Sequence, residues 1–205
     1  MADIVGTNNP ESLEGTNDAD VINGLGGDDR IVGFNGDDQI LGGAGDDLVI
    51  GGKGDDLLKG GEGDDVLRGG TGEDNLQGGE GDDKLLGGEG NDTLYANSGN
   101  DFMYGGSGDD WLFSGTGNDF LFGGEGADTF VFQNLFDEGT GHDRVVDFEV
   151  GIDTLVIRAT GDTDFASLDI NQVGSNTVIN LADGSSLTLN NITATDLSAD
   201  DFNIV

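Results

Sequence analysis

The chain of 205 residues has no cysteine, one proline, one histidine and only 7 basic residues. Without cysteine there is no disulfide framework, and His142 alone cannot supply the His and Cys ligands that zinc prefers. No stretch approaches the ~18 uninterrupted apolar residues of a spanning helix. Residues 1–5 lack the basic stretch and apolar core of an N-terminal signal peptide. We therefore predict no membrane insertion, and a fold that disulfides do not stabilise.

Positive charge is scarce, whereas negative charge is abundant. The chain has 42 acidic residues and a formal net charge of −35. Such a charge repels nucleic acid and anionic membrane surfaces and attracts cations. We therefore predict cations as partners, and neither nucleic acid nor lipid.

Glycine is abundant, with 40 residues, and it is arranged periodically. From Gly6 to Val131 the chain reads as fourteen consecutive nonapeptides of the form G-G-x-G-x-D-x-U-x, where U is apolar; Gly42–Ile50 and Gly51–Lys59 are nearly pure examples. Glycine adopts positive φ at little cost, so the first six residues of each unit are predicted to form a loop. The last three alternate outward, inward and outward, which predicts a very short strand. Such short strands are stable only when many of them stack.

This repeat resembles that of the RTX (repeats-in-toxin) family. The resemblance implies an all-β fold, a right-handed parallel β-roll in which two nonapeptides make one turn and residues eighteen apart stack. The apolar position-eight residues would then fill the interior between two parallel sheets. They are Ile22, Ile31, Ile40, Val49, Leu58, Leu67, Leu76, Leu85, Leu94, Met103, Leu112, Leu121 and Phe130.

Position six of the units supplies the candidate metal ligands. They are Asp20, Asp29, Asp38, Asp47, Asp56, Asp65, Asp74, Asp83, Asp92, Asp101, Asp110, Asp119 and Asp128. Stacked at eighteen-residue spacing, these carboxylates would form two columns of like charge at roughly 4.8 Å intervals and would repel one another. Carboxylate and carbonyl oxygens suit Ca²⁺, which accepts 6–8 oxygen ligands in flexible geometry, better than Mg²⁺.

The pairs from Asp20/Asp38 to Asp110/Asp128 predict about eleven Ca²⁺ sites, and Glu11/Asp29 a weaker twelfth. Residues 6–131 contain 28 acidic and 5 basic residues, a net charge of −23, and eleven calcium ions would bring +22. Two alternatives have less support. A solvated or disordered acidic segment does not require an apolar residue two places after each acid, and a phosphate loop would need a Lys followed by Ser or Thr, which is absent.

Some units depart from the pattern. Thr16, Leu25 and Phe34 stand where glycine is expected, so we predict that the first units form a frayed N-terminal cap with weaker binding. Asn97 and Ser114 also replace glycines later in the chain. The chain is accordingly divided into a degenerate first unit (1–14), a β-roll (15–131) and a C-terminal cap (132–205).

The cap segment 128–157 resembles the region that follows the β-roll in serralysin-type secreted proteins. Alternation over 176–181, a turn at 182–184 and a return along 186–189 predict a β-hairpin. After Arg158 the chain has no Lys or Arg and ends in an acidic segment with apolar residues, which resembles the type I secretion signal of RTX proteins. The resemblance implies a protein secreted from a bacterium by a type I apparatus.

Late outward positions become aromatic, which predicts a covered surface. Phe102, Tyr104, Phe120 and Phe122 would line one sheet, and Tyr95, Trp111 and Phe113 the other. We expect the cap, through Leu135, Phe136, Val145, Phe148, Leu155 and Ile157, to fold back over at least one of these faces and to close the end of the roll. A second protomer, forming a homodimer, would cover the other face.

The sequence favours a binding or structural module that folds on Ca²⁺ outside the cell, and not an enzyme. One His and scattered Ser and Thr residues offer no catalytic triad. The alternative is that the chain is the C-terminal secretion and folding module of a larger secreted enzyme of the protease, lipase or alginate epimerase type. Met1 lies just before the first unit, which favours a complete chain.

Overall fold

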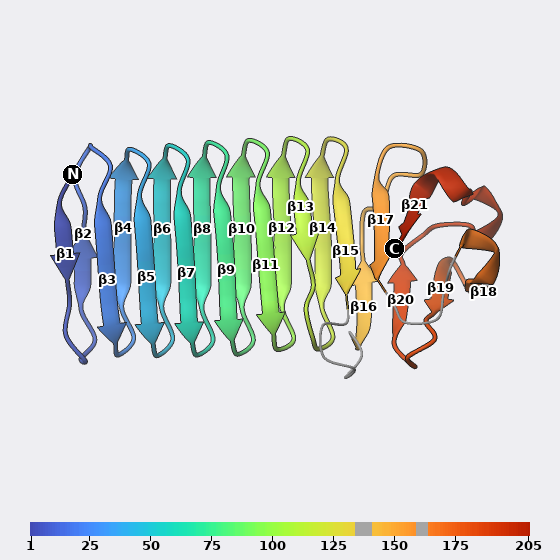
Figure 1. The fold of residues 1–205 in the computed structure, drawn as a ribbon, viewed down its shortest axis with the longest axis horizontal. Coiled ribbons are helices and arrows are strands. Elements are labelled where there is room, and N and C mark those ends of the chain that lie inside the picture. Colours follow the sequence, from blue (N-terminus) through green and yellow to red (C-terminus); the bar gives the residue numbers. More distant parts are fainter. Residues whose placement is uncertain (134–140, 159–163) are drawn as a thin grey trace.

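The computed structural model describes residues 1–133, 141–158 and 164–205 of the chain. Within these residues the fold is a parallel β-solenoid of two facing sheets with a small β-rich cap at one end (Figure 1). In the described ranges, the helical elements are three short 3-10 turns, η1 (Phe165–Ser167), η2 (Ala194–Asp196) and η3 (Ala199–Asp201). No helix in the described part of the chain is long and apolar enough to cross a membrane.

The odd-numbered strands of the roll form sheet A and the even-numbered strands form sheet B. Sheet A runs β1 (Asp3–Val5), β3 (Val21–Gly26), β5 (Gln39–Ala44), β7 (Leu57–Glu62), β9 (Asn75–Glu80), β11 (Thr93–Ser98), β13 (Trp111–Phe113), β15 (Thr129–Gln133), β17 (Thr154–Arg158) and β21 (Phe202–Ile204). Sheet B runs β2 (Ser12–Glu14), β4 (Arg30–Asn35), β6 (Leu48–Lys53), β8 (Val66–Thr71), β10 (Lys84–Glu89), β12 (Phe102–Ser107), β14 (Phe120–Glu125), β16 (His142–Val145), β20 (Ser186–Leu189), β19 (Asn176–Asn180) and β18 (Asp169–Val173).

Stacking at eighteen residues, as the RTX resemblance implied, is confirmed. Ile40 pairs with Leu58 and Leu58 with Leu76, always in parallel register. All thirteen predicted interior residues are buried, with exposed fractions of 0–2%, and they belong to one continuous core. Since a three-residue alternation fixes which side chain points inward, the nine-residue period alone was enough to define this core.

The predicted loops are wrong in length. Most strands of the roll span six residues, as in β6 (Leu48–Lys53), because the ladder continues through positions one to three of the next unit. Only positions four to six, such as 54–56, turn the corner. Position-two glycines pair in register, as Gly43 does with Gly61, at a φ of 125° for Gly43. The prediction assigned these glycines to a loop, whereas they bend the strand without ending it.

The first units are better formed than predicted. β3 and β4 reach the full six residues, although Leu25 and Phe34 occupy glycine positions there. Both residues have a left-handed backbone conformation, with φ values of 76° for Leu25 and 83° for Phe34. This conformation is costly for residues with a Cβ, so the stacked neighbours impose it. Among the first four strands, β1 and β2 are reduced to three residues.

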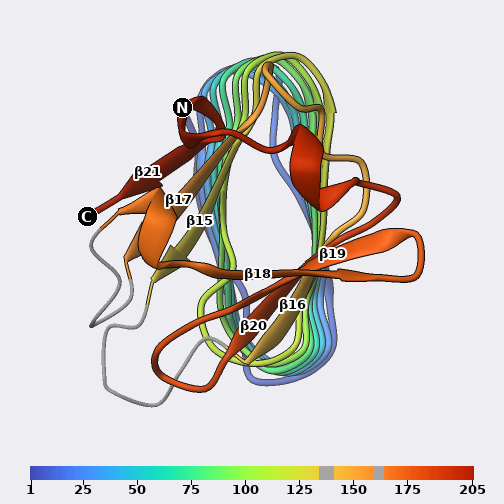
Figure 2. The ribbon, with the colours of Figure 1, turned by 90° about the vertical axis from the view of Figure 1, so that its right-hand side faces the viewer.

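The cap continues the solenoid. β16 pairs with β14 and β17 with β15, both in parallel, so residues 142–158 add one further strand to each sheet. The predicted hairpin is confirmed by antiparallel pairing of β19 with β20. β20 extends sheet B beyond β16, and β18 crosses the mouth of the roll (Figure 2). Val145, Phe148, Leu155 and Ile157 join the core, which closes the C-terminal end as predicted.

The prediction that the cap folds back over an aromatic face is wrong for its exposed rings. Tyr104 and Phe120 on sheet B have exposed fractions of 41% and 49%, and Trp111 on sheet A has 45%. The physical reason is that the unpaired edge strands β14 and β15 offer backbone hydrogen bonds, which β16 and β17 satisfy by extending the sheets. Leu135 and Phe136 lie outside the described residues.

Candidate metal centre

The thirteen predicted aspartates lie at the loop ends of the strands in two columns, one along each edge of the roll. All have exposed fractions between 0% and 3%. Every predicted pair is in direct contact, because the Oδ1 atom of one aspartate accepts a hydrogen bond from the backbone N–H of the aspartate eighteen residues earlier. From Asp20/Asp38 to Asp110/Asp128 these N to Oδ1 distances are 2.6–3.0 Å.

The second carboxylate oxygen of the inner aspartates has no hydrogen-bond partner. The residues concerned in the described part of the roll are Asp29, Asp38, Asp47, Asp56, Asp65, Asp74, Asp83, Asp92, Asp101, Asp110 and Asp119. An unpartnered buried oxygen costs free energy, and a charged one costs more. A row of such atoms therefore requires a partner that the polypeptide does not supply.

The surroundings of these Oδ2 atoms are rich in oxygen, and in most units a glycine at position one adds no Cβ there. A Cβ placed on Gly60 would overlap Asp65 Oδ2 and lie 2.7 Å from the carbonyl oxygen of Gly78, in the next turn. Gly105 repeats this arrangement with Asp110 Oδ2 and the Gly123 carbonyl, again at 2.7 Å. The position-one glycine thus leaves a space in which a carboxylate and a carbonyl of successive turns converge. Such a donor set suits a hard cation.

The pKa values of the column aspartates also indicate a bound cation. Burial, together with neighbouring aspartates in the column, raises the pKa of Asp56 and of Asp65 to about 7. Burial and the adjacent Asp143 raise the pKa of Asp119 to about 9. The folded roll therefore disfavours the ionised carboxylates unless a positive charge lies among them.

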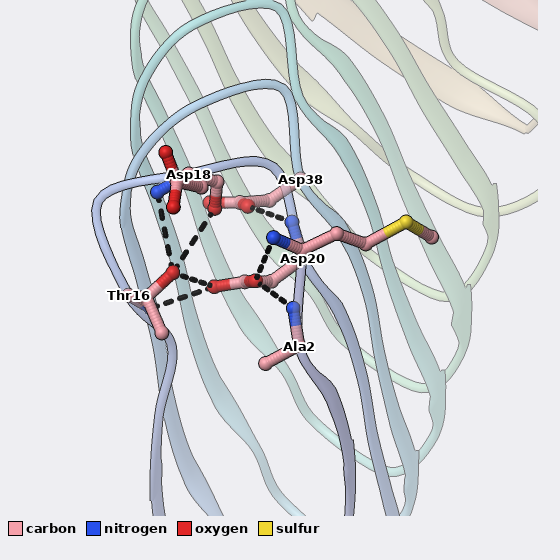
Figure 3. A network of polar contacts seen from close by, with 6 residues as sticks. Ala2, Thr16, Asp18, Asp20 and Asp38 are labelled. Atoms are coloured by element: carbon pink, nitrogen blue, oxygen red, sulfur yellow. Dashed lines mark hydrogen bonds and ion pairs between the residues drawn. The ribbon is translucent and has the colours of Figure 1, made fainter.

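The N-terminal ends of the two columns use protein donors instead. Asp20 accepts from Ala2 N through Oδ1, and its Oδ2 accepts from Thr16 N at 2.6 Å and Thr16 Oγ1 at 2.9 Å (Figure 3). The hydrogen bond from Ala2 N holds the pKa of Asp20 below its usual value. Glu11 likewise binds Thr7 N and Thr7 Oγ1, both at 2.8 Å. These ends have no oxygen left over.

Two aspartates beyond the repeats continue the columns, and sequence reasoning missed them. Asp143 Oδ1 accepts from Asp119 N and Asp153 Oδ1 accepts from Asp128 N, both at 3.0 Å. They lie 24 and 25 residues after Asp119 and Asp128, so the eighteen-residue spacing of the repeats does not predict them. The available signal was the triplet Asp-x-apolar, which the units share with 143–145 and 153–155.

Position five forms a second, exposed ladder. Asp46 N donates to Asp28 Oδ1 at 3.1 Å, and Asp64 N donates to Asp46 Oδ1 at 3.0 Å. Within the described ranges no group of three or more His, Cys, Asp or Glu side chains gathers as a metal site. A metal in the roll would therefore take many of its ligands from the backbone, between pairs of position-six carboxylates.

Comparison with known proteins identifies the repeat. The family model described as "RTX calcium-binding nonapeptide repeat (4 copies)" matches residues 5–40, 14–49, 32–67, 41–76, 68–103 and 104–132. Together these matches cover more than half of the chain. The chain belongs to this family. RTX repeats bind calcium, and the unpartnered Oδ2 atoms beside carbonyl oxygens fit that ion.

The fold is shared with a solved structure of a larger protein. The extracellular lipase LipA from Serratia marcescens matches with a TM-score of 0.53 at 20% identity, over 96% of this chain and 40% of the lipase. This chain thus spans less than half of the length of that protein. The AlgE6R2 subunit of the Azotobacter vinelandii mannuronan C5-epimerase is 31% identical, with a TM-score of 0.46, over 62% of this chain and 91% of the subunit. No curated protein sequence matches the chain.

Proposed function

We propose that this calcium-binding β-roll is a secreted protein that folds on Ca²⁺ outside the cell and acts there as a binding or structural module. The observation that carries the proposal is the pair of aspartate columns, buried and with Oδ2 atoms that lack protein partners. The thirteen position-six aspartates are the proposed ligands, at about eleven sites. Bound Ca²⁺ would place two positive charges between successive carboxylates.

The chain's own residues set when folding occurs. At low calcium the columns repel themselves and burial penalises each ionised carboxylate, as the raised pKa of Asp65 shows. The strands contribute only one buried apolar side chain per unit at position eight, so core burial alone has little to offset this penalty. Extracellular calcium modules bind at about 10⁻⁴–10⁻³ M. Binding free energy then becomes folding free energy.

Circular dichroism tests calcium-dependent folding. In EDTA the spectrum should be that of a largely disordered chain, and titration with Ca²⁺ to millimolar levels should produce a cooperative β signal. Mg²⁺ at the same concentration serves as the control and should produce much less β structure. A β spectrum that chelation leaves unchanged would contradict the proposal.

Export by a type I apparatus is the second part of the proposal. The acidic segment after Arg158, without Lys or Arg, supports it. Deleting residues 159–205 in a bacterium with a type I exporter should leave the protein inside the cell. Calcium-free growth medium gives the matched comparison, because export should persist without calcium while folding of the exported chain does not. Undiminished export of the truncated chain would contradict this part.

The alternative function is that of a folding module within a larger secreted enzyme. The observation in its favour is that a region of this fold occupies 40% of an extracellular lipase. An upstream catalytic region in the same reading frame would establish this alternative. Within the described residues, the only histidine, His142, lies on the surface and contacts Ser186 Oγ at 2.9 Å.

The exposed aromatic residues favour a homodimer as the form of the module. Tyr95 and Phe113 stack at 4.5 Å beside Trp111, and on sheet B Arg144 lies 5.7 Å from the ring centre of Phe120. Aromatic rings at 41–49% exposure are typical of interfaces. Sedimentation of the calcium-loaded protein should show a dimer that Trp111→Ala weakens.

A further inference from the structure

The two columns do not end alike at the cap. In the column that leads into sheet A, Asp153 is satisfied at both oxygens, since Oδ1 accepts from Asp128 N at 3.0 Å and Oδ2 accepts from Glu149 N at 2.8 Å. This arrangement resembles Asp20 at the opposite end, whose Oδ2 also binds the backbone N–H of the residue four places earlier. At this end the protein itself supplies the partners.

The column that leads into sheet B ends differently. Asp119 is fully buried, and its Oδ2 has no hydrogen-bond partner. Asp143 lies directly above it in the next turn, at 1% exposure, with its Oδ1 bound to Asp119 N. β14 and β16 fix this stacking through the pairing of Phe120 with Arg144. Thus one unpartnered carboxylate oxygen is buried at the boundary between roll and cap.

Ser114 supplies a second, independent observation. It occupies position one of its unit, where eleven other units in the described roll have a glycine against the Oδ2 of their own aspartate. Ser114 is fully buried, and its Oγ has no hydrogen-bond partner. A buried hydroxyl with no hydrogen-bond partner destabilises the fold. Ser114 holds position one of the unit whose Asp119 also has an unpartnered Oδ2, and position one faces that oxygen in the glycine-containing units, which indicates a shared ligand.

The residue stacked one turn below gives the internal comparison. Ala96 holds position one of the unit that contains Asp101, eighteen residues before Ser114, and it is also fully buried. The fold therefore accepts a Cβ at this point of the column. What Ser114 adds to the Ala96 arrangement is the oxygen alone. Packing does not explain that oxygen, since alanine fills the same space.

We infer that Ser114, Asp119 and Asp143 form a calcium site outside the nonapeptide pattern, which joins the cap to the roll. The inference rests on the proposed calcium-dependent fold. Two carboxylates and a hydroxyl are oxygen donors of the kind that Ca²⁺ takes. The site would make docking of β16 on β14 depend on calcium, whereas β17 docks on β15 beside an aspartate that the backbone already satisfies.

Calcium counting by equilibrium dialysis tests the inference on the full chain. Asp143→Asn should bind about one ion fewer than wild type. Asp153→Asn, the matched control at the other column, should bind the wild-type number. Ser114→Ala reproduces Ala96 and should keep the fold, while the affinity of one site falls about three- to tenfold, as expected for one lost oxygen contact.

Hydrogen exchange gives a second readout that does not depend on counting. At limiting calcium, amides of β16 should exchange faster in Asp143→Asn and in Ser114→Ala than in wild type, with β17 unchanged. Wild-type calcium binding in both variants, or equal ion loss in Asp143→Asn and Asp153→Asn, would overturn the junction site and leave the proposed function intact. A wild-type chain that binds no calcium would instead overturn the proposed function.

Discussion

The roll and the cap bury acidic side chains in opposite ways. In the cap, the half-buried Asp147 accepts from Gly123 N and Gly124 N at 3.0 and 3.1 Å, and the buried Asp201 accepts from Gly151 N and Ser198 N, both at 2.7 Å. In the roll, each inner aspartate uses one oxygen for its neighbour and leaves the other without a partner. The difference teaches that burial of carboxylates is not by itself a metal signal, whereas burial without protein donors is.

Removal of calcium should show this difference between the roll and the cap most strongly. In EDTA the amides of β5–β10 should lose nearly all protection from hydrogen exchange, because their aspartates lose the only partners of Oδ2. The hairpin β19–β20 has no such residue in its strands and should lose less protection. Mass spectrometry of peptides from both regions measures the contrast. Equal loss in both regions would mean that the cap has no stability of its own.

A single substitution in the middle of the roll should have the next largest effect. Asp65→Asn keeps an oxygen for Asp47 N but removes a charge from two adjacent pairs, so the calcium midpoint should rise about tenfold, which corresponds to ~1.4 kcal/mol. Asp64→Asn is the control, with the same charge change on an exposed neighbour. Glu11→Ala, at the satisfied end, should scarcely change the midpoint. Similar midpoints for all three variants would contradict the assignment of ligands.

These comparisons show what the nonapeptide period made predictable. Because position eight fixes the inward side and position six the loop end, the buried core of the roll and every Asp pair between repeat units were readable from the sequence. Strand length was not, since the glycines at positions one and two, such as Gly42 and Gly43, belong to strand β5 despite their loop-like composition. Asp143 and Asp153 were missed because their place depends on strand pairing after the period ends.

Acidity should partly replace calcium in the roll. Burial raises the pKa of Asp92, Asp101 and Asp110 to about 7, well above the usual range of an aspartate. The folded state thus binds protons more tightly, so this stabilisation is fully present below about pH 4 and is lost as pH rises to about 7. Calcium-free protein should show more β structure at pH 4.5 than at pH 7.5 by circular dichroism. The same spectrum at both pH values would contradict the buried columns.

The smallest effect concerns the N-terminal units. Leu25→Gly and Phe34→Gly relieve left-handed φ values and should each raise the stability of the calcium-loaded protein by about 1 kcal/mol. Leu41→Gly is the control, since Leu41 is similarly exposed at 38% but has no such backbone strain, and it should destabilise by roughly 0.5–1 kcal/mol. Thermal unfolding in excess calcium measures all three. If all three substitutions destabilise the protein to the same degree, the backbone at Leu25 and Phe34 is not strained.

The central claim, that calcium neutralises the buried aspartate columns, is tested most directly by anomalous X-ray scattering from crystals grown in calcium. We predict two rows of anomalous peaks inside the loop edges, each between the Oδ2 atom of one position-six aspartate and the next turn. Peaks confined to the exposed position-five side chains, such as Asp46 and Asp64, with none beside Asp47 and Asp65, would contradict the account.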